Sequence, residues 1–156
     1  MAENRPICPR DAAALMNGAL EDIRFHKCPK CHGVSVQASR LTELLEDMIV
    51  RLKKNPGKFK LAPAVPDRGQ KAACPDCGVE MANGPYDDST VVVDRCEACD
   101  KLWLDTFELG AICVHHAKKR HGLNLSPTPT GSDPAQDFVA WWLLMHFIPL
   151  DIDLGI

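Results

Sequence analysis

The chain has 156 residues, eight of them cysteine, and a formal net charge of −3 at pH 7. A chain of this length holds one ordinary domain, or two very small units that need more than a hydrophobic core for stability. The acidic balance does not suit a protein with a broad basic surface, so we do not favour a nucleic acid as the partner.

The number of cysteines indicates where additional stability comes from. The first ten residues, MAENRPICPR, contain no apolar run that could act as a secretory signal. We therefore expect a cytoplasmic protein in a reducing compartment, where paired cysteines serve as metal ligands or redox groups more often than as structural disulfides. This pattern predicts a metal-stabilised protein.

One sequence unit occurs twice. An offset of 66 residues pairs Cys8 with Cys74 and the Asn-Gly dipeptide at 17–18 with that at 83–84. The offset then becomes 68, because the loop GPYDDST of the second copy is two residues longer. The agreement of cysteines with turn residues indicates an internal repeat. The pairs at the offset of 68 are Ile23 with Val91, Phe25 with Val93, Cys28 with Cys96, Cys31 with Cys99 and Leu41 with Leu109.

In chain order, each copy predicts a Cys-Pro knuckle, an Asn-Gly hairpin turn, a strand, a second knuckle and a helix. The first helix, SRLTELLEDMIVRLKK, is amphipathic. The second, LDTFELGAICVHHAKKRHG, has Asp105 as N-cap, Glu108 completing a capping box and Gly122 as its stop. The apolar stripe of the first helix consists of Leu41, Leu44, Leu45, Met48, Ile49 and Leu52.

The second copy contains a strong metal-binding pattern. Two C-x2-C knuckles are separated by eighteen residues, a spacing typical of a tetrahedral zinc site. Four thiolates fill four positions and leave none for a substrate, so the site is predicted to be structural, and we expect no enzymatic activity. The predicted ligands are Cys74, Cys77, Cys96 and Cys99.

Residues 74–110, CPDCGVEM…VDRCEACDKLWLDTFELG, resemble the zinc ribbons of the transcription-factor-IIB-type zinc-finger family. The shared pattern is a Cys-Pro-x-Cys knuckle, a second C-x2-C, then Trp-Leu-Asp at 103–105 and Glu-Leu at 108–109. The resemblance is strong over 74–115 and weak over 8–52, where Ser35, Val36 and Gln37 replace Trp-Leu-Asp. It implies a zinc-bound hairpin followed by a helix, and a role linked to transcription.

The first copy has Asp11 where the second copy has a cysteine. A carboxylate oxygen can bind zinc, so Cys8, Asp11, Cys28 and Cys31 are predicted as a second site. His26 and His32 flank the second knuckle and are alternative fourth ligands, and loss of metal from this copy is the third alternative. We therefore expect two zinc ions per chain, or one if the first copy has lost its site.

Three further features have ordinary structural interpretations. Cys113 is predicted as a small core residue, and Trp103 as packing between hairpin and helix. The stretch VHHAKKRHG contains His115, His116 and His121, and its cations suit the last turn of a helix better than they suit a ligand or phosphate site.

The sequence divides into five segments: a degenerate ribbon unit at 1–54, a Pro-rich linker at 55–73, a ribbon unit at 74–122, a linker at 123–136 and an apolar tail at 137–156. In the tail, an apolar helix of about 15 residues would reach only about 22 Å, too short to cross a bilayer. It is followed by a strand-like alternation from 148 to 156. Predicted partner-binding residues are Phe138, Trp141, Trp142, Met145, Ile148, Leu150, Ile152, Leu154 and Ile156.

The predicted fold class is small, metal-stabilised α+β, with two zinc-ribbon units, each a β-hairpin plus a helix, and an apolar C-terminal helix and strand. The predicted function is a non-enzymatic zinc-binding adaptor or regulator with a protein partner. The alternatives are a thiol redox-sensing zinc protein and an adaptor that docks on a membrane surface through its tail. The tail has no Lys or Arg, which disfavours an anionic membrane; its other alternative is packing against the ribbons.

Overall fold

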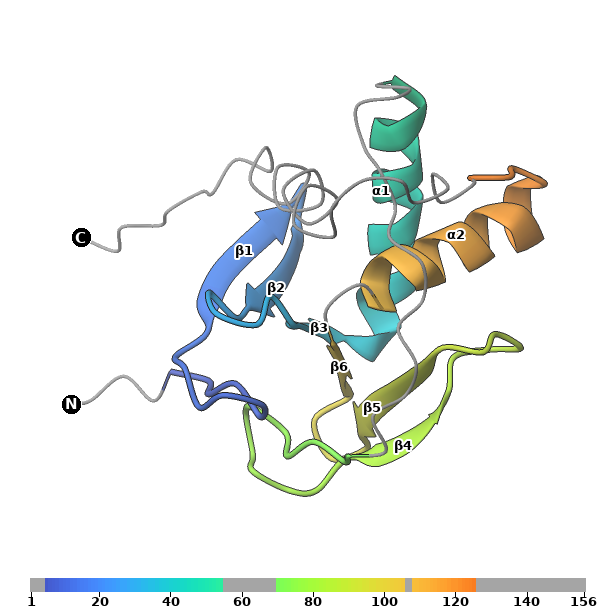
Figure 1. Cartoon of the computed structure of the whole chain (residues 1–156). Coiled ribbons are helices and arrows are strands. Elements are labelled where there is room, and N and C mark those ends of the chain that lie inside the picture. The colour runs from blue at the N-terminus through green and yellow to red at the C-terminus, as the bar shows by residue number, and fades with distance from the viewer. Residues whose placement is uncertain (1–4, 55–69, 106–107, 126–156) are drawn as a thin grey trace, which may run out of the picture.

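A computed structural model describes residues 5–54, 70–105 and 108–125. These residues form a small α+β fold, one antiparallel sheet with two helices (Figure 1). The sheet has six strands in the order β1-β2-β3-β6-β5-β4. The elements are β1 (Met16–Leu20), β2 (Ile23–Lys27), β3 (Val34–Gln37), the short 3-10 helix η1 (Ala38–Arg40), α1 (Leu41–Lys54), β4 (Ala82–Pro85), β5 (Val92–Cys96), β6 (Lys101–Leu104) and α2 (Glu108–His121).

The strand order joins two three-stranded meanders along the pair β3 and β6, which we call the seam. Both meanders have the same register, because Asn17 pairs with His26 in one and Asn83 pairs with Asp94 in the other. The loops before β1 and β4 also agree, with isolated bridges at residues 7 and 14 and at residues 73 and 80. The offset found in the sequence therefore reappears in the backbone pairing.

The predicted Asn-Gly hairpin turns are wrong, because both dipeptides lie inside strands. The first turn is instead at Glu21 and Asp22, where Glu21 takes a positive φ of 52°. Gly18 is needed for space, since a Cβ there would lie 2.5 Å from a ring carbon of Phe25 on the neighbouring strand. The prediction of a two-stranded hairpin in each copy also missed β3 and β6, the strands that form the seam.

Alternation along the strands separates two buried clusters. In β6, Leu102 and Leu104 pack with the two helices, whereas Trp103 between them faces the other side of the sheet. All six predicted apolar residues of α1 are buried against this sheet, as expected. In Figure 1 both helices lie on one side of the sheet, and the cysteine-bearing loops before β1 and β4 lie away from the helices.

The second helix starts and ends close to the predicted positions. Gly122 takes a φ of +63° and its N–H donates to the Lys118 carbonyl at 3.1 Å, a glycine stop of the expected kind. Cys113 is fully buried in the helix-side core, as predicted, and burial raises the pKa of its thiol to about 12. Within the described ranges, neither helix has the length and apolar character that a membrane span requires.

Candidate metal centres

The four predicted ligands of the second copy converge. Cys74 and Cys77 come from the loop before β4, Cys96 ends β5, and Cys99 lies in the turn to β6, with all four Sγ atoms within 4.8 Å of one another. Cys77 Sγ and Cys96 Sγ are 3.6 Å apart. Tetrahedral zinc with bonds of about 2.3 Å places two sulfurs about 3.8 Å apart, whereas a disulfide needs about 2.05 Å. The spacing fits zinc.

In each copy, the backbone of the first knuckle forms a tight turn that positions its ligand residues. Cys74 N–H donates to the Val79 carbonyl and Gly78 N–H to the Cys74 carbonyl, both at 2.8 Å. Gly78 has a φ of +75°, which glycine adopts without steric cost. At the same position the first copy has Ala12 with a φ of 60°, which costs about 1–2 kcal/mol. The first copy keeps the knuckle conformation although its residue is less suited to it.

The cluster of the first copy contains Asp11. Its ligand atoms and those of Cys8, Cys28 and Cys31 all lie within 4.8 Å of one another, and Cys8 Sγ and Cys31 Sγ are 3.6 Å apart. The Cys28 thiol lies 3.3 and 3.4 Å from the two Asp11 oxygens. The donor set of three sulfurs and one carboxylate oxygen is one that zinc accepts.

The two alternative ligands, His26 and His32, do not join this cluster. His26 lies in β2, where burial lowers its pKa, and its buried Nδ1 has no hydrogen-bond partner in the described part of the chain. His32 follows Cys31 with a φ of 61°, the conformation that turns the second knuckle back toward β3. The structure thus brings Asp11, and neither histidine, to the three cysteines.

Backbone amides support the sulfurs of this cluster. Arg10 N–H donates to Cys8 Sγ, and the N–H groups of Lys30 and Cys31 both donate to Cys28 Sγ, each at 3.4 Å. Burial raises the pKa of the Cys8 thiol to about 11 although the Arg10 N–H bond lowers it. A metal ion must therefore displace a proton from this thiol, and acid should release the metal.

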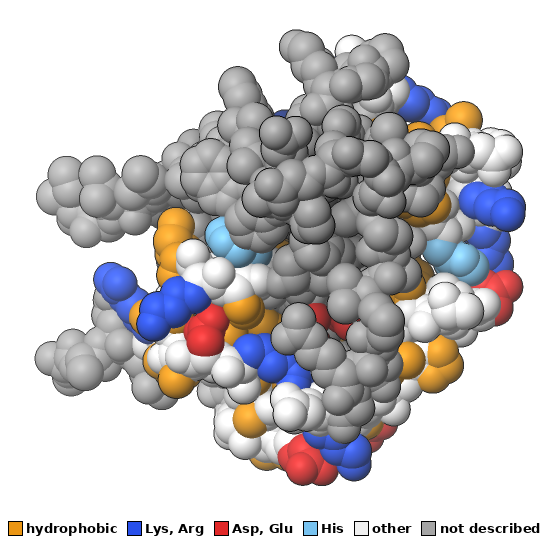
Figure 2. All heavy atoms as spheres, viewed as in Figure 1, with side chains coloured by type: hydrophobic (Ala, Val, Ile, Leu, Met, Phe, Trp, Pro, Cys, Tyr) orange, Lys and Arg blue, Asp and Glu red, His pale blue; other side chains and the backbone are white. Residues whose placement is uncertain are grey.

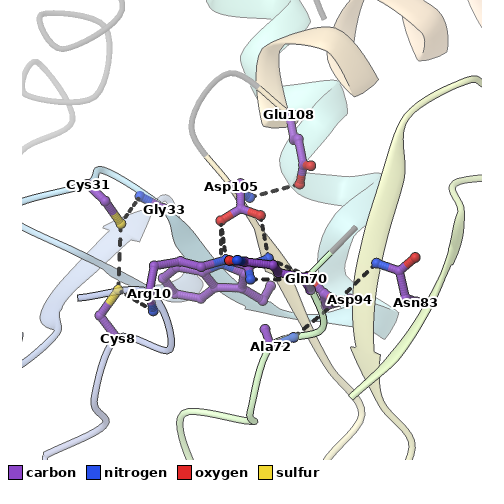
Figure 3. A network of polar contacts seen from close by, with 11 residues as sticks. Cys8, Arg10, Cys31, Gly33, Gln70, Ala72, Asn83, Asp94, Asp105 and Glu108 are labelled. Atoms are coloured by element: carbon purple, nitrogen blue, oxygen red, sulfur yellow. Dashed lines mark hydrogen bonds and ion pairs between the residues drawn. The ribbon is translucent and has the colours of Figure 1, made fainter. Parts of the chain in front are cut away.

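The arginine of the first knuckle connects the two copies (Figure 3). Arg10 donates from Nε and Nη2 to the two oxygens of Asp105, at 2.9 and 2.7 Å, and from Nη2 to Asp94 Oδ2 at 3.2 Å. Asp94 is 2% exposed, and burial raises its pKa. Because this carboxylate is removed from water, its guanidinium partner matters for stability.

Asp105 is shared between this ion pair and the helix start. Its N–H donates to Glu108 Oε2 at 2.8 Å, which is half of the predicted capping box, while its carboxylate accepts from Arg10 and from Trp103 Nε1. Trp103 is fully buried beside the cysteine knuckles, so its predicted packing between hairpin and helix is wrong. Sequence reasoning also missed Arg10, although the reversal of charge from Arg10 to Asp76 between the copies was a visible signal.

Comparison with known families identifies part of the chain. Residues 73–115 match the family model described as transcription factor zinc-finger. This segment is a transcription-factor-IIB-type zinc ribbon. The match contains the four cysteines of the second cluster and the Trp-Leu-Asp motif, and it does not include residues 8–52. A search of curated proteins and a search of solved structures each found no match.

The predicted partner-binding residues, 138 to 156, lie outside the described residues. The role assigned to them remains a prediction. The five-segment division of the chain, including the linker at 55–73 and the tail, likewise stays a prediction.

Proposed function

We propose that this protein is a non-enzymatic zinc-binding interaction module that holds two zinc ions and acts as an adaptor or regulator linked to transcription. The observation that supports it most is that each candidate centre gathers four ligand atoms, a complete tetrahedral set. A complete set leaves no position for substrate, and it replaces the core that a short loop-rich segment lacks. Function then resides in the surface that the zinc ions stabilise.

Zinc in the first copy depends on Asp11 in this proposal. Changing Asp11→Ala should lower the zinc content from two ions per chain toward one, because three thiolates alone hold the ion less tightly. Metal analysis of the purified full-length protein measures this directly. Asp22→Ala is the matched control, since the Asp22 side chain is 76% exposed and forms a surface ion pair with Arg40. A zinc content of Asp11→Ala equal to that of the unmodified chain would overturn the assignment.

The surface supports a protein partner over a nucleic acid. On the face in Figure 2 the described Lys and Arg side chains fall in separate groups, with acidic and apolar side chains beside them. Between the start of α1 and strands β4, β5 and β6 there is a groove of about 370 Å³, lined by residues that include Leu41, Pro85 and Tyr86. Among the described strands, β4 is an edge strand of the sheet. The open edge of a sheet can accept an extended peptide as an additional strand.

The adaptor role is tested through the tail. We expect the full-length protein to capture a specific partner from its source cells, and Trp141→Ser with Trp142→Ser to lose that capture. The control is the zinc content and thermal unfolding of the double variant, which should equal those of the unmodified chain. If the double variant captures the partner as well as the unmodified chain does, the partner binds the surface of residues 5–125 and not the tail.

One observation favours a second candidate, a thiol redox sensor. Cys77 is exposed, and the Val79 N–H bond lowers the pKa of its thiol to about 7, whereas Cys74 and Cys96 are buried. Hydrogen peroxide would oxidise two thiolates to a disulfide and, with two protons taken up from water, would itself be reduced to two water molecules, so that the zinc is released. Rapid zinc release by dilute peroxide from the loaded protein would favour the sensor, and slow release would favour the interaction module.

A further inference from the structure

A third group of potential ligands lies between the helices, away from the cysteines. Glu46 of α1 and His116 and His121 of α2 place their ligand atoms within 4.8 Å of one another. Glu46 Oε1 is 2.7 Å from His116 Nε2, and Glu46 Oε2 is 2.8 Å from His121 Nε2. One carboxylate thus joins two imidazoles on a neighbouring helix.

We propose that Glu46, His116 and His121 bind a divalent transition-metal ion such as zinc at the junction of α1 and α2. Two imidazole nitrogens and one carboxylate oxygen form a donor set that zinc uses when its fourth position stays available to water or a ligand. This site shares no residue with the two cysteine centres. It would fasten a helix of the first copy to a helix of the second.

The geometry requires only a small adjustment. With metal–ligand distances of about 2.0–2.1 Å, tetrahedral ligand atoms lie about 3.3–3.4 Å apart. The present contacts of 2.7 and 2.8 Å would each open by roughly half an ångström for this geometry. His116 is 5% exposed and held by the core, whereas His121 is exposed in the last turn and free to adjust its side chain.

The surrounding charges are compatible with a cation. His121 is the last residue of α2, where the helix dipole places partial negative charge. In the described part of the chain, Glu46 forms ion pairs with these two histidines and with no lysine or arginine. By contrast, the cluster of Asp87, Asp88 and His115 already holds a cation, Lys119 Nζ, at 2.6 and 3.1 Å from the two aspartates.

The test uses the full-length protein with both cysteine centres loaded with zinc, titrated with Co²⁺. We expect one additional equivalent to bind, with visible d–d absorption and without the thiolate-to-cobalt charge-transfer bands that a cysteine site produces. Glu46→Gln and His121→Asn should each weaken this binding by at least about tenfold, since each removes one of three ligands. His115→Asn, a change of the neighbouring histidine on the same helix, should leave the affinity unchanged.

Two results would overturn the proposal. One is the absence of a bound equivalent of Co²⁺ in addition to the two zinc ions, and the other is equal binding by the unmodified chain, Glu46→Gln and His121→Asn. Glu46→Gln keeps a hydrogen-bond acceptor between the helices, and His121 lies at an exposed helix end, so at least one variant should remain folded. Zinc measured in the cysteine centres of the same samples separates this outcome from a failure of the proposed function.

Discussion

The two halves of the sheet, residues 5–54 and 70–125, have the same strand register but differ where they meet. Residues at the offset of 66 or 68 have changed charge, size or ligand type at positions that face the other half or a metal centre. The difference teaches that the halves are complementary rather than one being a decayed copy of the other. The changed pairs are Arg10 and Asp76, Asp11 and Cys77, His26 and Asp94, Ser35 and Trp103, and Gln37 and Asp105.

The clearest example of complementarity lies at the centre of the seam. Ser35 and Trp103 occupy equivalent positions and are also direct partners across β3 and β6. Directly opposed side chains have Cβ atoms about 4.5–5.5 Å apart, so one indole leaves room only for a small neighbour. Trp103 also lies against Gly33, where a Cβ would be 2.2 Å from its ring. The first copy therefore needs a small residue at position 35, because a second tryptophan there would clash with Trp103.

The largest effect should come from removing a ligand of each metal centre in turn. Cys96→Ser should release one zinc ion and unfold the second half, because structural zinc contributes on the order of 10 kcal/mol or more to small folds. Cys28→Ser should release the other ion with a smaller loss, because its centre already has a carboxylate in place of one thiolate. Metal analysis and thermal unfolding followed by circular dichroism measure both. Equal losses would remove the distinction between the centres.

The packing at the seam predicts that replacing Trp103 lowers the stability of the protein much more than replacing Ser35, its partner on β3. Trp103→Ala should destabilise the protein by about 3–5 kcal/mol, the usual cost of a cavity left by a large buried side chain. Ser35→Ala should change stability little, since the buried Ser35 Oγ has no hydrogen-bond partner in the described ranges. Urea unfolding of both variants tests this, and a Ser35→Ala cost comparable with that of Trp103→Ala would contradict the packing account.

Replacing Arg10 should lower the free energy of unfolding more than replacing a surface arginine of the same half. Arg10→Met should cost about 3 kcal/mol, because it leaves Asp94 and Asp105 without their shared cation. Arg24→Met, an exposed position on β2, is the matched control and should be nearly neutral. The comparison of the two unfolding free energies is the measurement. If the two variants lose the same amount, the ion pair does not join the halves.

The smallest effect concerns Glu108, which is 8% exposed and has no acidic counterpart in the first half. Burial raises its pKa from 4.5 to about 7, so the folded state binds a proton more tightly than the unfolded state. Stability attributable to this group is complete below pH 4.5 and is lost as pH rises through about 7.

Glu108→Gln removes this titration while keeping the acceptor for the Asp105 N–H. The variant should be more stable than the unmodified chain at pH 8 by about 1–3 kcal/mol, with the difference shrinking toward pH 5. Unfolding in urea at several pH values measures it. A difference that is constant with pH would show that Glu108 titrates normally.

Much of the fold could be predicted from local patterns in the sequence. The cysteine spacing, the leucine stripe of α1 and the stop at Gly122 depend on nearby residues, and each was predictable. The seam was not, because nothing in VSVQ and KLWL specifies that these strands pair with each other across the intervening 60 residues or so. The contacts of Arg10 with Asp94 and Asp105 were hidden for the same reason. Both Asn-Gly dipeptides misled because they lie inside strands, and in the first of them Gly18 provides space for the Phe25 ring and not a turn.

The seam has a consequence for how such a chain could arise. Pairing of β3 with β6 maps onto itself when the two copies are exchanged, since Val34 corresponds to Leu102 and Val36 to Leu104, so the exchange turns the pair Val34–Leu104 into the pair Val36–Leu102. This is the relation of two identical subunits about a two-fold axis. An ancestral single-copy protein could have closed the same sheet as a homodimer. Fusion of two such copies into one chain would release each copy from symmetry, which is what allows Trp103 and Arg10 to occur in one half each.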